Sequence, residues 1–272
     1  MIVQVLFSIA AAWLLMATTM ALLFFLRHKI GNTGVVDAAW SLGVGTLALL
    51  YALLLPGNVV SRGLLALFAG VWSLRLGLHI LTDRVIGKPE DGRYLDLVAG
   101  YGENAPRRLF RFFQYQAFFV VVFSLPFLCI AMSPSRPQLW QVIAAAAVWC
   151  LAVGGEALAD RQLARWRADP AHRGHTCRQG LWRYSRHPNY FFEWVHWWTY
   201  VILGAAAPWG WVTLLGPVLM FFFLYRVTGI PYTEKQALKS RGDDYRRYQE
   251  TVSPFFPWFP KEYPDTRNAR RD

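Results

Sequence analysis

One group of residues that could do chemistry lies at the boundary between an apolar segment and a basic segment. Glu156, Asp160 and Arg167 fall at positions i, i+4 and i+11 of a helix, so they share one face. Ionisable groups at a membrane edge are costly and therefore indicate a site. An acid there accepts hydrogen bonds from a ribose or an amide, and an arginine holds a phosphate through two parallel bonds. The alternative is a boundary helix whose acids pair with Arg161, Arg165 or another loop.

A second polar group stands at the start of the next apolar segment. Pro188 suits the first turn of a helix, because it has no N–H to leave unsatisfied. The free N–H groups of that turn, together with Arg183 and Arg186, predict a site for phosphate or carboxylate. Asn189 and Glu193 share a face, and Glu193 lies one turn further in, where a carboxylate needs a partner or a ligand. The alternative is that this group only joins helices to one another.

A third polar group lies in the first half of the chain, within apolar segments. Asp37 is in one segment, and Trp72, Arg75 and His79 share a helical face in the next. Buried arginine and aspartate either neutralise each other or form the polar end of an apolar substrate cavity and supply a proton. Both interpretations are open at this point.

The composition indicates which elements hold these groups. Of 272 residues, 55% are hydrophobic and 17% are charged. Several apolar runs approach or exceed the ~20 residues that a helix needs to cross a bilayer. We therefore expect an all-α, polytopic membrane protein with about seven transmembrane helices and a single integral domain over residues 1–272. The apolar runs are 2–26, 35–55, 63–81, 112–132, 139–159, 190–206 and 209–225.

The basic residues predict the orientation of these spans. The loops after the first, third and fifth runs and the C-terminal tail hold 25 of the 28 Lys and Arg residues. Cytoplasmic loops carry such an excess, so we expect the N-terminus outside and the C-terminus in the cytoplasm. This asymmetry also accounts for the net charge of +11 without nucleic acid. On the simpler interpretation the charge only sets topology and contacts anionic membrane lipids.

Four further features complete the expected organisation. The three cysteines form no CxxC pair, so neither a disulfide framework nor a metal site is predicted. Residues 82–111 have the charge and the Gly and Pro content of a long loop. Gly43 and Gly45 indicate close helix packing within a span. The prolines from Pro254 onward exclude a continuous helix near the end of the chain.

The order of the polar residues carries a family resemblance. The motifs are Glu156-x-x-x-Asp160 followed by Arg167, then Gly180-Leu181-x-x-Tyr184-Ser185-x-x-x-Asn189-Tyr190-x-x-Glu193, and Asp244-Tyr245-x-x-Tyr248 in the tail. This order resembles the C-terminal domain of the steroid 5α-reductase superfamily, and most of all its bacterial branch. The resemblance covers residues 149–260, the cofactor-binding region. Residues 1–148 then supply substrate-side spans, and 261–272 form a polar tail.

The resemblance implies an enzyme. It implies NADPH bound in a cytoplasm-facing cavity, and hydride transfer to a carbon–carbon double bond conjugated to a carbonyl in a steroid-like or other lipophilic substrate. The residues that it assigns to the cofactor are Glu156, Asp160, Arg167, Tyr184, Arg186, His187, Asn189, Tyr190, Glu193, Glu234 and Tyr245. Trp72 stands where the family has a Tyr that helps to hold the carbonyl, and an indole is no proton source. Asp37 and His79 are the candidate catalytic residues.

Two other classes of protein remain as alternatives. Membrane methyltransferases of the isoprenylcysteine and phospholipid type also carry Arg-His-Pro-x-Tyr, here at 186–190, with a Glu and spaced Tyr in the tail, and they bind S-adenosylmethionine. Glu156, Asp160 and Arg167 upstream and Glu193 downstream favour the reductase. The third class is a non-catalytic lipid-binding membrane protein, which would retain neither cofactor.

Overall fold

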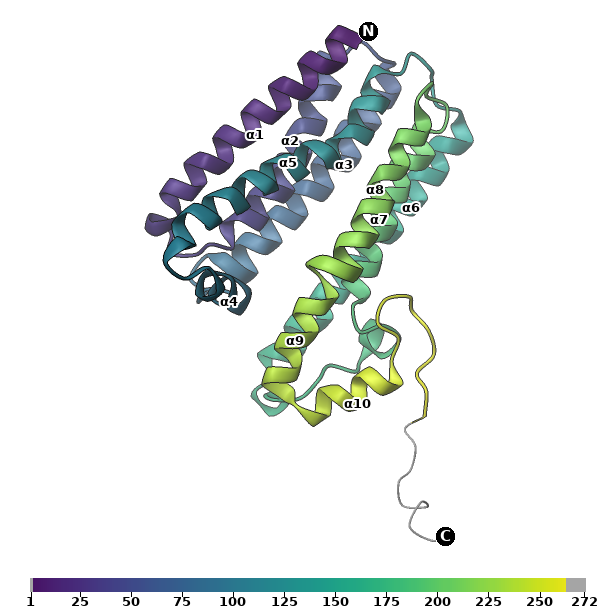
Figure 1. Cartoon of the computed structure of the whole chain (residues 1–272). Coiled ribbons are helices and arrows are strands. Elements are labelled where there is room, and N and C mark those ends of the chain that lie inside the picture. The colour runs from purple at the N-terminus through teal and green to yellow at the C-terminus, as the bar shows by residue number, and fades with distance from the viewer. Residues whose placement is uncertain (1, 263–272) are drawn as a thin grey trace. The chain divides into compact units, whose positions relative to one another are not determined.

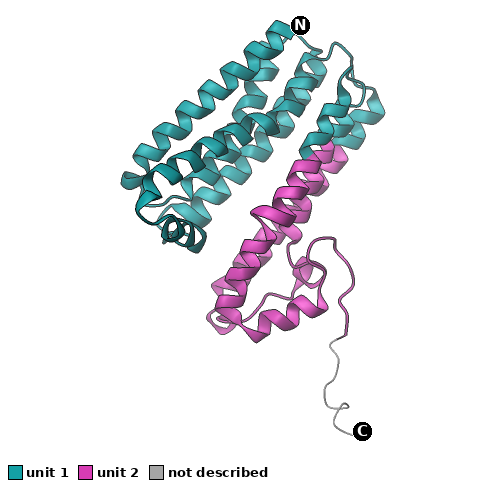
Figure 2. Ribbon diagram, in the orientation of Figure 1, with its two compact units in different colours: residues 1–145, 200–216 teal, residues 146–199, 217–272 magenta. Residues whose placement is uncertain are grey.

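The computed structural model describes residues 2–262, and every regular element in that range is a helix. The all-α prediction is therefore confirmed. Most of the predicted polar tail, residues 263–272, lies outside the described residues. The chain forms two compact units (Figure 2). Unit 1 comprises residues 1–145 and 200–216, and unit 2 comprises 146–199 and 217–272.

Long apolar helices dominate the chain (Figure 1). Within residues 2–262, six segments are long and apolar enough to cross a membrane, so the chain is an integral multi-pass membrane protein. The other predicted span, 190–206, forms a helix of 17 residues, which measures only about 25 Å along its axis. The helices at the predicted spans are α1 (Ile2–Ile30), α2 (Val35–Leu54), α3 (Val59–Ile80), α5 (Ala105–Met132), α6 (Leu139–Ala168), α7 (Pro188–Gly204) and α8 (Leu215–Phe222).

Small residues let the helices of unit 1 approach one another closely. In this unit α2 packs against α3 and α5, and α1 packs against α5. A Cβ atom at Gly45 would come within 2.1 Å of Ser73 Oγ, and one at Gly43 within 2.8 Å of Met16 Sδ. Ser73 Oγ donates to the Ser41 carbonyl at 2.8 Å, across the same contact between α2 and α3. The close packing predicted at Gly43 and Gly45 is confirmed.

The prediction of a long loop over 82–111 was wrong for most of its length. A π-helical turn, Leu81–Val85, extends α3, and α4 occupies Gly92–Tyr101. The Asp91 side chain accepts from Arg93 N at 2.9 Å and so caps α4. Pro106 lies in the first turn of α5, where a missing N–H costs nothing. Several prolines and glycines that the sequence interpretation assigned to a loop instead lie at the ends of helices.

Unit 2 is built from shorter elements around the end of α6 and the start of α7. A 3₁₀ turn at Gly180–Arg183 precedes α7, and a π-helical turn at Phe223–Val227 follows α8. Two polar helices follow, α9 (Ile230–Arg241) and α10 (Asp243–Thr251). Gly242 joins them with a φ of +53°, which an L side chain rarely adopts. No helix continues from Thr251 to residue 262, as the prolines predicted.

The segment after α10 folds back onto the residues that precede α7. Ser185 Oγ donates to the Phe255 carbonyl at 2.9 Å, and Arg186 N donates to the Ser253 carbonyl at 2.9 Å. Tyr248 donates its hydroxyl to the Trp182 and Ser185 carbonyls. Phe255 is completely buried, with aromatic neighbours on α7 and α8. The end of the described chain therefore fixes the beginning of α7.

Candidate functional site

The structure distributes the predicted site residues between the two units. Unit 1 contains the candidate catalytic residues Asp37 and His79. Unit 2 contains every residue that the family resemblance assigned to the cofactor. That set comprises Glu156, Asp160, Arg167, Tyr184, Arg186, His187, Asn189, Tyr190, Glu193, Glu234 and Tyr245.

Glu234 on α9 is the centre of the densest polar cluster in unit 2. Its Oε1 atom accepts from Arg186 Nε at 2.6 Å and lies 3.2 Å from His187 Nε2. Tyr245 OH also donates to Oε1, at 3.4 Å, and Gln249 Nε2 donates to Oε2 at 2.7 Å. Only 10% of the Arg186 side chain and 13% of the Glu234 side chain are exposed. We call these five residues the Glu234 cluster.

Protonation states within the Glu234 cluster follow from burial. Burial lowers the pKa of His187 below its usual value, although the Glu234 carboxylate opposes this. At neutral pH the imidazole is therefore neutral, and its contact with Glu234 is a hydrogen bond rather than an ion pair. A carboxylate only accepts, so Nε2 carries the proton. Burial and the charge of Glu234 raise the pKa of Tyr245, so its phenol also stays protonated.

Arg186 also donates to two backbone carbonyls of the protein. Its Nη1 atom donates to the Gln249 carbonyl at 2.8 Å and to the Val252 carbonyl at 2.7 Å. The beginning of α7 is thus bound to α9, to the end of α10 and to the segment after it. Arg186 and Glu234 therefore hold the start of α7, where the sequence predicted an anion site.

A second contact joins α6 to α7. Asn189 Nδ2 donates to Asp160 Oδ1 at 3.3 Å. A Cβ atom at Gly155 would lie 2.5 Å from the Phe192 ring, so only glycine permits this approach of the two helices. The sequence predicted Asp160 and Asn189 as site residues on separate helices, and the structure brings them together.

Two acids are buried close to this contact. Glu156 is 4% exposed and follows Gly155, and Glu193 is 6% exposed and follows Phe192. Glu193 Oε1 accepts from Trp197 Nε1 at 3.2 Å, one helical turn along α7. Carboxylates in apolar helices are costly to bury, so by default they mark functional positions.

The other predicted cofactor residues are nearer the surface. Arg167 is exposed at the end of α6. Tyr184 is also exposed, and its ring lies 6.0 Å from the Phe259 ring. Tyr190 stacks on His187 and shares a hydrogen bond of 3.0 Å with Thr233 Oγ1 on α9.

Two glutamines that the sequence interpretation missed hold this region in place. Gln249 binds Glu234, as described above, and lies one turn after Tyr245. Gln162 Oε1 accepts from Leu181 N at 2.9 Å, under the left-handed Gly180. The i, i+4 spacing of Tyr245 and Gln249 was available as a signal. We find no comparable signal in the sequence for Gln162.

Asp37 in unit 1 has partners that the sequence did not indicate. Arg93 on α4 donates to its Oδ2 atom, and Tyr94 donates to its Oδ1 atom at 2.8 Å. The sequence had suggested neutralisation between Asp37 and the polar face of α3, but the acid pairs with α4. Trp72 is completely buried in α3. Asp37 thus stands within an Asp–Arg–Tyr group.

A comparison with known families gives a match over most of the chain. A sequence model of the family described as protein of unknown function (DUF1295) matches residues 23–252. The match covers most of both units and includes every candidate site residue. The curated proteins and the solved structures yielded no match.

Proposed function

We propose that this chain, which belongs to the DUF1295 family of proteins of unknown function, is a membrane-embedded, NADPH-dependent reductase. Its substrate would be lipid-like, with a carbon–carbon double bond conjugated to a carbonyl. The observation that carries the proposal is the junction of α6 and α7, where the Asp160–Asn189 contact adjoins two buried acids. The proposed orientation, with a cytoplasmic C-terminus, rests on the asymmetry of Lys and Arg.

The residues of unit 2 fit a phosphorylated dinucleotide. Arg161, Arg165 and Arg167 are exposed near the end of α6, where guanidinium groups would hold phosphate. Glu156 and Glu193 would accept hydrogen bonds from hydroxyl or amide groups. When bound, NADPH would supply a hydride. The Glu234 cluster would act indirectly, by fixing the start of α7.

Unit 1 offers a polar group for the substrate carbonyl. The superfamily that the sequence resembles uses a Tyr paired with an acid, and Trp72 occupies the position of that Tyr. Tyr94 and Asp37 form a tyrosine–acid pair from a different element, with the phenol donating at 2.8 Å. We propose that this pair replaces the absent Tyr. The single O–H of Tyr94 would turn from Asp37 to the substrate carbonyl when the substrate binds, and His79 would contribute to proton supply.

The Glu234 cluster also favours a second candidate function. Membrane methyltransferases combine the Arg-His-Pro-x-Tyr motif with a glutamate and spaced tyrosines in the tail. In this chain Arg186, His187, Glu234 and Tyr245 lie in one cluster. An S-adenosylmethionine-dependent methyltransferase is therefore the alternative, and a non-catalytic lipid-binding protein is the third possibility.

A thermal-shift titration of detergent-purified protein separates these candidates. A ligand that binds only the folded state raises the unfolding midpoint. We expect NADPH to raise it and S-adenosylmethionine to leave it unchanged. A shift with S-adenosylmethionine alone would replace the reductase by the methyltransferase. No shift with either ligand would favour the non-catalytic protein.

The variant Arg167→Ala tests the proposed phosphate contact. Hydrogen bonds to charged groups contribute about 1.5–3 kcal/mol, so NADPH affinity should fall roughly tenfold to hundredfold. NADH lacks the 2′-phosphate and should lose less. Arg173→Ala, which removes another exposed arginine after α6, is the matched control. Equal losses for both nucleotides would exclude Arg167 from the 2′-phosphate.

A further inference from the structure

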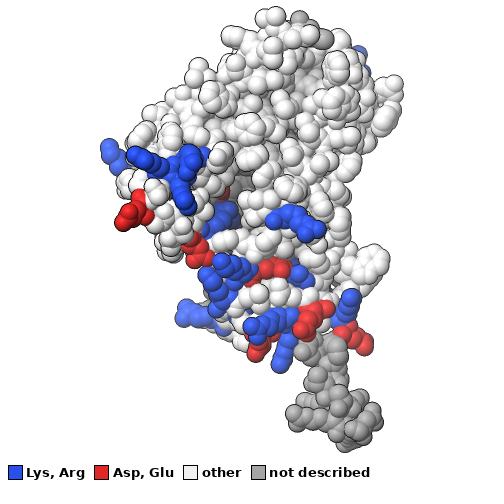
Figure 3. All heavy atoms as spheres, in the orientation of Figure 1, with Lys and Arg blue, Asp and Glu red and all other residues white. Residues whose placement is uncertain are grey.

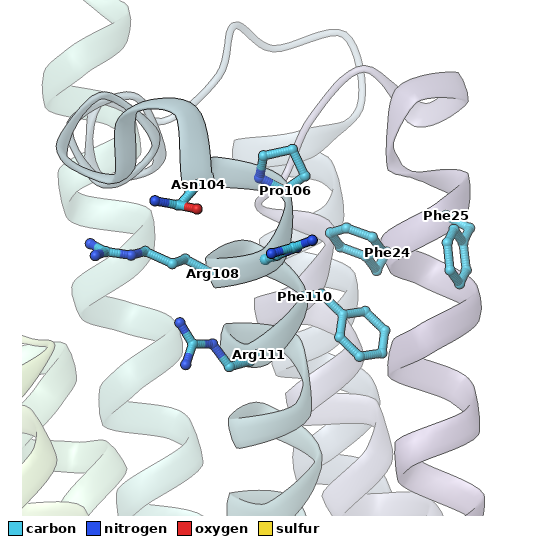
Figure 4. A pocket seen from close by; sticks show the side chains of 8 residues that line it. Phe24, Phe25, Asn104, Pro106, Arg108, Phe110 and Arg111 are labelled. Carbon is cyan, nitrogen blue, oxygen red and sulfur yellow. The ribbon is translucent and has the colours of Figure 1, made fainter.

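Unit 1 carries a basic and aromatic groove where α1 ends and α5 begins. Its volume is about 810 Å³. Its walls include three phenylalanines and three arginines, namely Phe24, Phe25, Phe110, Arg107, Arg108 and Arg111. In Figure 4, Phe24 and Phe110 lie on the side of α5 that faces α1, and Arg108 and Arg111 extend from the other side of α5. We call this feature the Arg–Phe groove.

The protein does not balance the charge of the Arg–Phe groove. None of its lining residues is Asp or Glu. Among residues 2–262, neither Arg107 nor Arg111 forms a hydrogen bond or an ion pair, and the contact of Arg108 is with the Tyr101 ring at 5.7 Å. Arg27 lies over the Phe24 ring at 3.8 Å and adds a fourth positive charge beside the groove. Four arginines without an acid in the lining attract an anion.

The backbone at the start of α5 strengthens this preference. Asn104 lines the groove as the N-cap residue, and its side chain makes no capping hydrogen bond. The helix that follows has 28 residues, so the positive end of a long helix dipole lies at the groove. The arginines and the helix start therefore favour the same kind of ligand.

The aromatic wall identifies the rest of the ligand. Both α1 and α5 belong to segments long and apolar enough to span a membrane, and Phe25 is 69% exposed. On the face seen in Figure 3, Lys and Arg side chains of unit 1 gather where α1 ends and α5 begins, with acidic side chains beside them. A soluble anion would leave the phenylalanines uncovered, whereas a lipid occupies both walls with one molecule.

We infer that the Arg–Phe groove binds a bilayer phospholipid with an anionic headgroup. Its phosphate lies against Arg107 and Arg111, which share a helical face at i, i+4. An acyl chain lies against Phe25 and Phe110. Basic pockets between transmembrane helices bind anionic headgroups in this manner. Binding does not require the proposed reductase activity.

Native mass spectrometry of the detergent-purified chain tests this inference. Dioleoyl phosphatidylglycerol and dioleoyl phosphatidylcholine are added at equal concentrations to the wild-type protein. We expect at least about tenfold more of the anionic lipid bound at the first binding step, because each basic residue near a headgroup favours it. Equal binding of the two lipids would overturn the inference without the use of any variant.

Two paired variants locate the site. In Arg107→Gln/Arg111→Gln the preference for phosphatidylglycerol should fall at least about fivefold. Arg165→Gln/Arg173→Gln, which removes two exposed arginines of unit 2, should keep it. An equal fall of the phosphatidylglycerol preference in both variants would show a general charge effect and would contradict binding at the Arg–Phe groove.

Inorganic phosphate distinguishes the lipid from a free anion. Millimolar phosphate should displace little of the bound phosphatidylglycerol, because it cannot replace the acyl contact with Phe25 and Phe110. Phe110→Ala should weaken phosphatidylglycerol binding while the arginines remain. Complete displacement by phosphate, together with unchanged lipid binding in Phe110→Ala, would make the groove a site for soluble anions instead.

Discussion

Replacing Glu234 by Gln should destabilise the folded protein strongly, because it removes one member of a buried ion pair. Glu234 receives hydrogen bonds from Arg186, His187, Tyr245 and Gln249. Glutamine preserves the size but replaces one accepting oxygen by a donating NH₂ group. Arg186, which is nine-tenths buried, then loses its counter-charge.

The magnitude follows from the burial of the pair. Breaking a buried ion pair by removing one partner costs about 3–5 kcal/mol, and the lower end applies here because the amide oxygen still accepts one bond. At roughly 2–4 °C per kcal/mol for a chain of this size, about 3 kcal/mol lowers the unfolding midpoint by roughly 6–12 °C. This shift of the midpoint is measured by thermal unfolding in detergent, with intrinsic tryptophan fluorescence as the signal.

Asp243→Asn is the control for Glu234→Gln. Asp243 pairs with Arg246 at 2.7 Å, but 80% and 69% of their side chains are exposed. Exposed pairs contribute little, so the midpoint should not change measurably. An unfolding midpoint of Glu234→Gln within about a degree of the wild-type midpoint would refute a stabilising buried ion pair. So would an equal fall of the midpoint in Asp243→Asn. If NADPH still raises the unfolding midpoint of the destabilised Glu234→Gln variant, Glu234 positions α7 without contacting the cofactor.

Three further predictions test other parts of unit 2. Gly155→Ala should cost about 1–3 kcal/mol, because its Cβ atom would lie 2.5 Å from the Phe192 ring. In Gly154→Ala the added Cβ atom meets no atom within 4 Å, so this control should be neutral or stabilising. Equal unfolding midpoints for Gly155→Ala and Gly154→Ala would show that α6 and α7 do not approach closely at Gly155. His187 has a folded-state pKa below its usual value, so the unfolded state takes up the proton first as the pH falls. Stability should be full above about pH 6.5 and decline below it, with a shallower decline in His187→Gln; identical midpoint-against-pH curves would contradict this. Glu193→Gln should abolish the proposed reductase activity while the yield of monodisperse protein stays unchanged, and loss of folded protein would instead make Glu193 structural.

Local rules were sufficient for much of the fold. Apolar run lengths predicted the membrane helices, because crossing a bilayer requires a minimum number of consecutive apolar residues. Pro188 begins α7 as predicted, since its ring suits the first helical turn. The same rule was overlooked at Pro106, where a proline interpreted as a loop residue begins α5.

Motif order also placed the candidate cofactor residues within one part of the chain. All of them lie in unit 2, although nothing in the spacing showed which side chains meet. Local periodicity relates residues only a few positions apart. It could identify Glu193 and Trp197 as neighbours on one helix, and the structure joins them at 3.2 Å.

Only the tertiary structure decided the partners of the buried charges. Arg186 meets Glu234 across 48 positions, and Asp37 meets Arg93 across 56. A buried charge must find an opposite charge or a hydrogen-bonding partner, and the sequence establishes that need. Which partner satisfies it depends on how distant helices pack, because side chains far apart in sequence become neighbours only in the folded chain. The sequence by itself therefore determined which residues require partners, and the packing determined which residues serve as those partners.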